Sequence, residues 1–239
     1  MEKKQNFFSV VLLGPPGSGK SAQALCLSKF FQLKHVDIGM ELRKVAQEDT
    51  PQGKEIYNYM YKEHSLISDE IIENLLQNDI CKRSECRRGI ILDGAPRRIG
   101  QIERIEKILQ KQEIPLLRVI SLSVKKESLI KRIKHRYFCP RCFSFYIEGK
   151  DIQNAQKDLC PRCQYPLMKR EDDTLEGVEK RLNIFEEETL PVIEEYRRKK
   201  ILLEIDGDRE GEIVCQNVYE QITLILREKE YENKNTSRN

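Results

Sequence analysis

FFSVVLLGPPGSGKSAQALCL, residues 7–27, joins an apolar run to a glycine-rich loop and then to a helical pattern. The apolar run at 8–13 ends at a glycine and predicts a buried parallel strand. Residues 14–21, GPPGSGKS, fit the pattern G-x-x-x-x-G-K-[ST], and a helix is expected from Lys20 to about Phe31. Glycines let successive backbone N–H groups face phosphate oxygens, and the helix N-terminus adds partial positive charge. The stretch therefore predicts a phosphate-binding loop. The strand and helix around it disfavour the alternative, a chance glycine-proline turn.

Short apolar runs alternate with amphipathic stretches along the rest of the chain. The predicted strands are KHVDI, GIILD at 89–93, LRVISLSV at 117–124 and KILLEID at 200–206, and the predicted helices are 41–48, 52–62, 68–80, 99–112, 125–136 and 176–199. This alternation is typical of an α/β fold with a doubly wound parallel sheet. Residues 137–168 break the rhythm with four cysteines and several aromatic residues, so a small inserted subdomain is expected there. The tail REKEYENKNTSRN lacks apolar periodicity and is expected to be a frayed, solvated end.

The composition is that of a globular protein with a highly charged surface. Of the 239 residues, 39% are hydrophobic and 34% are charged, and 42 basic against 39 acidic residues give a net charge of +3. This balance gives no overall bias towards polyanions, so an anion site must be a local cluster of arginine or lysine. No apolar run approaches the roughly 18–20 residues that span a bilayer, and no signal peptide is recognised, so a cytoplasmic location is expected. In that reducing compartment the eight cysteines are not expected to be disulfides.

Three side chains near the loop can handle phosphate and its metal ion. Lys20 can reach the β- and γ-phosphates of a nucleotide, and Ser21 can offer its hydroxyl to Mg²⁺. Asp93, at the end of a predicted strand, can hold Mg²⁺ through water. The loop alone leaves three uses of the phosphate open: it can drive motion, act as a switch, or be transferred to a second molecule.

The arginines favour transfer. Arg97 and Arg98 directly follow a predicted strand, at the usual ligand crevice of such sheets. Other arginines bracket the cysteine-containing insert: Arg132, Arg136, Arg170 and Arg181. A single arginine is more often a solvated surface charge, but this bracketing favours a functional role. A motor or a switch needs few such groups, whereas a transferase must neutralise two phosphorylated substrates at once.

The insert has the cysteine spacing of a zinc site. Cys139-Pro-Arg-Cys142 and Cys160-Pro-Arg-Cys163 form C-x₂-C-x₁₇-C-x₂-C, which suits a tetrahedral site with four thiolate ligands. Reduced cysteines in a loop are the alternative. Because all four ligands would come from the protein, the expected metal is structural and holds a small insert folded.

The other cysteines and the histidines carry no predicted catalytic chemistry. Cys26 and Cys215 are expected in the core, and Cys81 and Cys86 at the surface. His35 and His64 are expected to be structural, and His135, between Arg132 and Arg136, is a candidate minor neighbour of phosphate.

In their order along the chain, these motifs resemble the adenylate kinase family, in its long form with a zinc-bearing lid. The resemblance spans about residues 8–226 and rests on the segments GPPGSGKSAQA, HVDIGMELR, LISDEI, LDGAPRRIGQ, KRIKHRYFCPRC, KREDD…VEKRL and IDGDRE. It implies the reaction ATP + AMP ⇌ 2 ADP, with Mg²⁺ accompanying ATP and a structural Zn²⁺. It also implies a monomer without nucleic-acid or membrane partners. The implied parts are a P-loop core at 1–36, 69–136 and 169–239, a monophosphate-binding segment at 37–68 and a zinc lid at 137–168.

The resemblance assigns the site residues to three groups. The implied ATP-binding residues are Gly17, Ser18, Gly19, Lys20, Ser21, Ala22, Arg132, Arg136, Phe145, Tyr146 and Arg209. The implied AMP-binding residues are Ile38, Gly39, Arg43, Ser65, Leu66, Ile67, Gly94, Ala95, Pro96, Arg97, Gln101, Arg170 and Arg181. The implied catalytic residues are Lys20, Asp93, Arg97, Arg132, Arg170 and Arg181.

The monophosphate pocket departs from the family pattern. Ile38 stands where a hydroxyl residue is usual, Met40 where an acid is usual, and Ala95 where an aromatic residue is usual. We expect Ala95 to open space near the base. One lost pocket hydrogen bond costs about 1–3 kcal/mol in discrimination, so CMP, UMP, GMP or dAMP remains open as the acceptor.

Two further alternatives lie outside an active kinase. A weakly active nucleotide-binding paralogue is one, although the phosphate-loop lysine, the acid and the arginines are all present. A nucleic-acid-binding protein is the other, because four-cysteine zinc modules and basic helices also occur in that class. Against it, the basic residues gather at the predicted nucleotide sites and do not form one exposed stripe.

Overall fold

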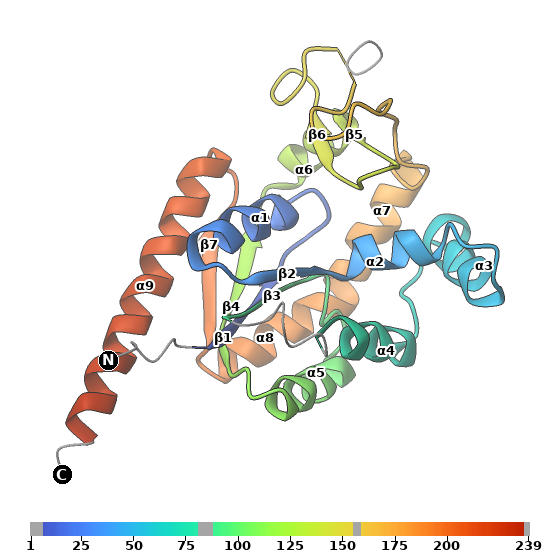
Figure 1. Ribbon diagram of the computed structural model, residues 1–239. Helices are drawn as coiled ribbons and strands as arrows, with labels where there is room; N and C mark the ends of the chain where they lie inside the picture. Colours follow the sequence, from blue (N-terminus) through green and yellow to red (C-terminus); the bar gives the residue numbers. More distant parts are fainter. Residues whose placement is uncertain (1–6, 81–87, 155–158, 237–239) are drawn as a thin grey trace.

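A parallel sheet with helices on both faces forms the centre of the computed structural model, which describes residues 7–80, 88–154 and 159–236 (Figure 1). Within these residues the sheet has five strands in the order β2-β3-β1-β4-β7, and all neighbouring pairs are parallel. The strands are β1 (Phe8–Leu13), β2 (Lys34–Asp37), β3 (Gly89–Asp93), β4 (Leu116–Ser123) and β7 (Leu202–Asp206). The predicted doubly wound sheet is confirmed, and β1 and β3 have the predicted bounds.

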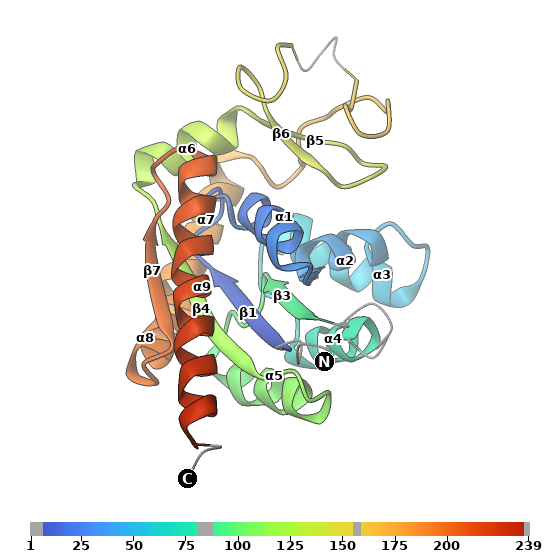
Figure 2. The ribbon, with the colours of Figure 1, turned by 60° about the vertical axis from the view of Figure 1, so that its left-hand side comes forward.

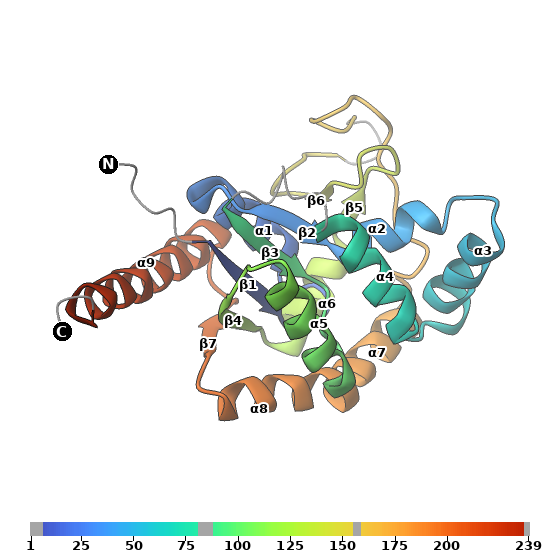
Figure 3. The same cartoon turned by 60° about the horizontal axis from the view of Figure 1, so that its bottom comes forward.

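The side chains of β1 divide the core into two layers. Val11 and Leu13 pack in a cluster with residues of α4 (Asp69–Ile80), α5 (Ile99–Lys111) and α8 (Leu190–Arg198), which lie together in Figure 3. Val10 and Leu12 pack on the opposite face, with residues of α1 (Lys20–Phe31) and α9 (Gly211–Thr236). An uninterrupted apolar strand therefore fits here, because both faces of the sheet are covered. Among the described helices, none has both the length and the apolar character needed to cross a membrane.

Two excursions leave the sheet at the carboxyl ends of its strands (Figure 1). The first follows β2 and contains α2 (Ile38–Val45), α3 (Pro51–Tyr57) and the π-helical turn η1 (Asn58–Glu63). The second follows β4. It contains α6 (Lys126–Lys134), the antiparallel pair β5 (Arg136–Phe138) and β6 (Phe145–Ile147), and then α7 (Leu175–Ile184) with the π-helical turn η2 (Phe185–Thr189). The three-part division expected from the sequence remains a prediction.

Side-chain caps explain where the first excursion turns. The Asp37 carboxylate accepts a hydrogen bond from the backbone N–H of Met40 at 2.8 Å and so caps α2. Thr50 caps α3 in the same way, with Pro51 in the first helical turn. The helix therefore begins immediately after the strand, earlier than the predicted start at residue 41.

The expectation of a frayed tail is wrong for residues 227–236. These residues continue α9, which projects beyond the sheet (Figure 2). The segment is rich in Glu, Lys and Arg, which are strong helix formers, so a helix forms there without an apolar face. The last three residues of the predicted tail lie outside the described part of the chain.

Cys26 and Cys215 are joined by a disulfide that links α1 to α9. The expected core position is confirmed for Cys215, which is buried, whereas Cys26 is partly buried against the same hydrophobic cluster. The expected reduced state is wrong. The two helices pack side by side and bring together cysteines that are 189 residues apart in the sequence. Cys81 and Cys86 lie outside the described residues.

Candidate active site

A cavity of about 450 Å³ opens at the carboxyl ends of the strands, and residues of the insert, among them Phe145 and Tyr146, form part of its wall. This is where parallel α/β sheets bind ligands. With one exception, Ala95, the structure places every predicted ATP-binding, AMP-binding and catalytic residue in the wall of this cavity. One space therefore contains both predicted nucleotide sites.

The phosphate loop is held in shape by its own lysine. The Lys20 Nζ atom donates hydrogen bonds to the carbonyl oxygens of Gly14 at 2.8 Å and Pro15 at 2.9 Å. Gly19 caps α1 in the left-handed conformation, with φ of 94°, which a glycine adopts without strain. Burial, together with the nearby Arg97 and Arg136, lowers the pKa of Lys20 to about 8 against the opposing effect of Asp93. An incoming phosphate would add the anionic partner that the buried ammonium group needs.

Asp93 lies beside this loop with three polar neighbours. Ser21 Oγ donates a hydrogen bond to Asp93 Oδ2 at 2.5 Å, and His35 Nε2 lies 3.5 Å from the same oxygen. Burial opposes ionisation of Asp93, but the contacts with His35, Lys20 and Ser21 outweigh it and keep the pKa of this carboxyl below its usual range. Ionisation of Asp93 is therefore favoured, and its predicted role at Mg²⁺ remains a prediction.

Asp37 is a functional candidate that the sequence analysis missed. It is the direct neighbour of Asp93 in the β2–β3 pair and is buried. Burial and the negative charge of Asp93 raise the pKa of Asp37. An acidic residue inside the predicted strand KHVDI was the available signal, since adjacent parallel strands end at the same edge of a sheet.

Two buried aspartates fix three arginines in the cavity wall. The Arg170 guanidinium binds both oxygens of Asp172, with Nε at 2.8 Å from Oδ1. Arg181 spans the two acids, at 3.0 Å from Asp172 Oδ2 and 2.7 Å from Asp173 Oδ1. Arg136 binds Asp173 through Nε at 3.0 Å and Nη2 at 2.6 Å. Despite burial, Arg170 and Arg181 lower the pKa of Asp172 to about 2, so the acids remain charged and the arginines stay in place.

The predicted monophosphate residues form a second group around Arg97. The Gln101 side chain accepts a hydrogen bond from the backbone N–H of Arg97 at 2.6 Å and donates one to Asp69 at 2.7 Å. Arg43 is buried, lies 4.0 Å from Asp37 Oδ1, and has a pKa lowered to about 10 by burial and by Arg170. Arg97, whose Nε donates a hydrogen bond to the Gly94 carbonyl oxygen at 3.0 Å, and Arg43 thus place two cations in the wall of the same cavity.

The first excursion and the insert also touch one another. The Tyr57 hydroxyl, at the end of α3, donates a hydrogen bond to Glu171 Oε2 at 2.7 Å. The guanidinium carbon of Arg43 lies 5.2 Å from the centre of the Phe145 ring, within cation–π range. Both contacts join residues of α2 and α3 to residues at or beside the insert.

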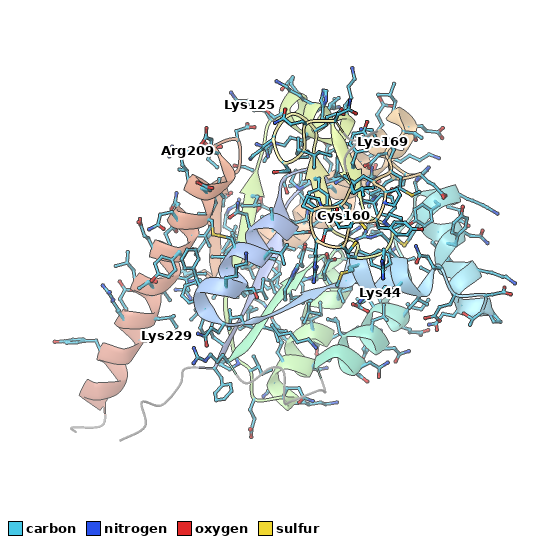
Figure 4. The ribbon with its side chains drawn as sticks, turned by 45° about the horizontal axis from the view of Figure 1, so that its top comes forward. Lys44, Lys125, Cys160, Lys169, Arg209 and Lys229 are labelled. Carbon is cyan, nitrogen blue, oxygen red and sulfur yellow. A yellow bond between two sulfur atoms is a disulfide. The ribbon has the colours of Figure 1, made fainter. Side chains whose placement is uncertain are left out.

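The remaining ATP-side residues lie at the opposite end. Arg132 Nη2 donates a hydrogen bond to the carbonyl oxygen of Gly207 at 2.8 Å, in the loop before α9. Arg209 is exposed on that loop, 3.4 Å from Asp206, and Figure 4 labels it at the start of α9. Arg132 of α6 therefore connects the loop before α9 with the phosphate loop, where it also lies 3.5 Å from the Ser18 carbonyl oxygen.

Two of the residues singled out in the sequence do not line the cavity. Ala95 is buried in a hydrophobic cluster, which does not support the expectation that it opens space beside the base. His135 is the C-cap residue of α6, which does not support a place beside phosphate. In contrast His64, expected to be structural, lines the cavity, as do Met60 and Lys150, which the sequence analysis did not single out.

The four cysteines of the insert converge. Their sulfur atoms all lie within 4.8 Å of one another, with 3.4 Å between Cys139 and Cys163 and 3.5 Å between Cys142 and Cys160. Figure 4 labels Cys160 within the insert. Burial opposes ionisation of Cys160, but the Tyr146 hydroxyl and nearby backbone N–H groups lower its pKa to about 6. Four converging sulfurs, in a donor set typical of structural zinc, fit a tetrahedral ion.

Comparison with known proteins agrees with the motifs. The adenylate kinase family model matches residues 12–201. An adenylate kinase of Caldanaerobacter subterraneus subsp. tengcongensis is 38% identical over 209 residues, which cover 87% of this chain and 93% of the relative. An adenylate kinase of Clostridium perfringens (strain SM101 / Type A) is 35% identical over 218 residues, covering 91% and 97%. One of Methanocella arvoryzae is 36% identical over 208 residues, covering 87% and 95%.

Proposed function

Because the chain belongs to the adenylate kinase family and phosphorylates AMP with ATP, we propose that the cavity at the carboxyl ends of the strands holds the two nucleotides with their phosphates facing each other. The observation that carries this proposal is the position of Arg136, Arg170 and Arg181. These arginines line the same cavity as the phosphate loop and Arg97, and two buried aspartates hold them there. Opposed phosphates would meet between them.

ATP would lie on residues 17–21, with its phosphates near Arg132 and Arg136 and its adenine towards the Arg209 loop. The support is the hydrogen bond from Arg132 to Gly207, which ties α6 to that loop across the phosphate loop. AMP would lie against Gly39, Arg43, Arg97 and Gln101. The support is that these residues line the same cavity, as do Ser65, Leu66 and Ile67.

Phosphoryl transfer requires little covalent participation by protein side chains. Phosphoryl transfer depends on in-line placement and on positive charge around the moving group, which Lys20 and the fixed arginines provide. Adenylate kinases use Mg²⁺ with ATP, and the ion neutralises charge on the β- and γ-phosphates. Ser21 and Asp93 fit that ion, because a hydroxyl and an ionised carboxylate meet beside the phosphate loop. The insert covers the cavity and would exclude water, which would otherwise accept the phosphoryl group.

AMP is expected to be the best acceptor in a comparison with CMP, UMP, GMP and dAMP. Two departures from the family pattern are Ile38 and Ala95. Ile38 lines the cavity, whereas Ala95 is buried in a hydrophobic cluster, so only the departure at Ile38 changes the cavity surface. We expect kcat/KM with Mg·ATP and AMP to exceed that with CMP, UMP or GMP at least about tenfold, the size of one pocket contact. A higher value with another base would contradict the AMP assignment. No turnover, despite ATP binding, would indicate a nucleotide-binding paralogue.

We also propose that Cys139, Cys142, Cys160 and Cys163 hold one structural Zn²⁺. The convergence of the four sulfurs supports this assignment. No coordination position remains for substrate, so the ion would stabilise the insert and take no part in the reaction. The monomeric state, the absence of nucleic-acid and membrane partners and the cytoplasmic location expected from the sequence remain predictions.

Removal of zinc is expected to unfold the insert. Chelation should release about one zinc per chain and lower the melting temperature, because Phe138 and Ile152 are the only buried apolar side chains besides the cysteines among the described residues of the insert. Metal analysis by mass spectrometry and a thermal scan would measure both effects. The double variant Cys26→Ser/Cys215→Ser is the matched control and should keep its zinc. A purified protein without zinc, equally stable with and without chelator, would disprove the assignment.

A further inference from the structure

The side-chain amide of Gln101 is held at both of its ends. Its oxygen accepts a hydrogen bond from the backbone N–H of Arg97 at 2.6 Å, and its nitrogen donates one to Asp69 Oδ1 at 2.7 Å. A backbone N–H can only donate and a carboxylate oxygen accepts, so these two partners select one of the two possible amide orientations. Gln101 is 4% exposed and lines the cavity. The cavity wall therefore carries this amide in one fixed orientation.

Asp69 is itself positioned by Arg98. Arg98 Nη1 lies 3.4 Å from Asp69 Oδ1, the oxygen that binds Gln101, and it also donates a hydrogen bond to the carbonyl oxygen of Ile67 at 3.3 Å. Asp69 is in the first turn of α4, which packs beside α5, the helix that Arg98 precedes (Figure 3). Ile67 and Gln101 line the cavity, whereas Asp69 and Arg98 do not. Asp69 and Arg98 therefore influence the cavity through the residues that they bind.

A fixed amide can distinguish adenine from guanine. After the bonds to Arg97 and Asp69, the Gln101 amide keeps one free lone pair on its oxygen and one free N–H. Adenine offers a donor, its exocyclic amino group, beside the acceptor N1, whereas guanine offers an acceptor, O6, beside the donor N1–H. Glutamine amides bind adenine through two hydrogen bonds in other recognition sites. An amide that could turn over would bind either base, but an amide held in one orientation binds only one of them.

We propose that Asp69, held by Arg98, is a positioning residue that sets the base specificity of the acceptor site. It fixes the Gln101 amide in the orientation that binds adenine and rejects guanine. The inference rests on the proposed function, because that function places the base of AMP against Gln101. Without the Asp69 carboxylate, the amide nitrogen of Gln101 loses its acceptor, so the amide can turn and offer guanine the opposite pair of hydrogen bonds.

The test compares AMP with GMP as acceptors for the full-length wild type and for Asp69→Ala. The ratio of kcat/KM for AMP to that for GMP should fall at least about fivefold in the variant, mainly through a lower KM for GMP. A loss of stability alone would lower both values equally and leave their ratio unchanged. The dissociation constants of AMP and GMP, measured by calorimetry without ATP, should show the same change. An unchanged ratio of these dissociation constants would overturn the proposal.

Two further variants show whether the acceptor oxygen is responsible. Asp69→Asn keeps an oxygen that Arg98 can hold, so this variant should retain most of the preference for AMP. Glu70→Ala is the matched control, since Glu70 is an exposed acid in the same first turn of α4. It removes a charge from the same helix end but leaves the acceptor of Gln101 in place, so its ratio should equal that of the wild type. A fall in either variant as large as that in Asp69→Ala would contradict the proposal.

The two measurements separate the inference from the proposed function. The proposed function would fail if the wild type formed no ADP from Mg·ATP and AMP. The inference would still be supported if AMP bound more tightly than GMP and Asp69→Ala removed that difference. ADP formation with the same AMP-to-GMP ratio in the wild type and in Asp69→Ala would leave the kinase intact and overturn the inference.

Discussion

Replacing Lys20 with Met is expected to lower turnover about 10³-fold or more while the protein stays folded. The ammonium group is the cation of the phosphate loop, and Met has a similar length without the charge. Burial already lowers the pKa of Lys20 to about 8, so removal of the charge relieves a desolvation cost. The melting temperature of Lys20→Met should therefore equal or exceed that of the wild type. Steady-state ADP formation and a thermal scan measure the two effects.

Lys29→Met is the matched control for this prediction. Lys29 is an exposed lysine in the last turn of the same helix, α1. Its replacement should change neither turnover nor stability by a measurable amount. Near-normal activity of Lys20→Met would remove the phosphate-loop argument, and an unfolded variant would show that the hydrogen bonds to Gly14 and Pro15 are needed for folding.

Replacing Arg170 with Met is expected to lower turnover by about 10³-fold, since charge-stabilising arginines contribute about 10³ to 10⁵ in phosphoryl transfer. Arg170 lies in the cavity wall and is held by both oxygens of Asp172. In the variant Asp172 keeps a second cation, Arg181, at 3.0 Å, so the buried carboxylate is not left unpaired. The loss should therefore appear in kcat, with the fold retained.

Arg197→Met provides the comparison for Arg170. Arg197 also binds carboxylates, those of Glu194 and Glu204, but at the exposed surface of α8. Exposed pairs contribute about 0–1 kcal/mol, so its removal should leave kcat unchanged. If kcat of Arg170→Met fell no more than that of Arg197→Met, Arg170 would have no part in the transfer.

Local sequence patterns were sufficient to predict the strands of the sheet and most of the residues that line the candidate site. The bounds of β1 and β3 could be predicted because each is an uninterrupted apolar run that ends at a glycine or an aspartate followed by one. The phosphate loop could be predicted for the same reason, since its glycines, lysine and helix are contiguous. Arg132 and Arg136 could not be placed from the helical repeat, because α6 ends at Lys134 and Arg136 begins β5, although both side chains line the cavity.

Contacts between distant segments could not be predicted in this way. The direction of Ala95 depends on how the chain leaves β3 and packs on α5, which no periodicity encodes. The Cys26–Cys215 disulfide depends on the packing of the first helix against the last. Asp37 acquires its importance from a neighbour on another strand, Asp93. In each case the deciding partner lies far away along the chain.

The hydrogen bond between Tyr57 and Glu171 has a consequence for how the two substrates bind. One partner belongs to the excursion that would receive AMP, and the other lies at the edge of the insert that would cover ATP. Because this hydrogen bond joins the two segments, a nucleotide that stabilises one of them in the position seen here also stabilises the other. Thermodynamic linkage is reciprocal, so ATP must change the dissociation constant of AMP by the same factor by which AMP changes that of ATP.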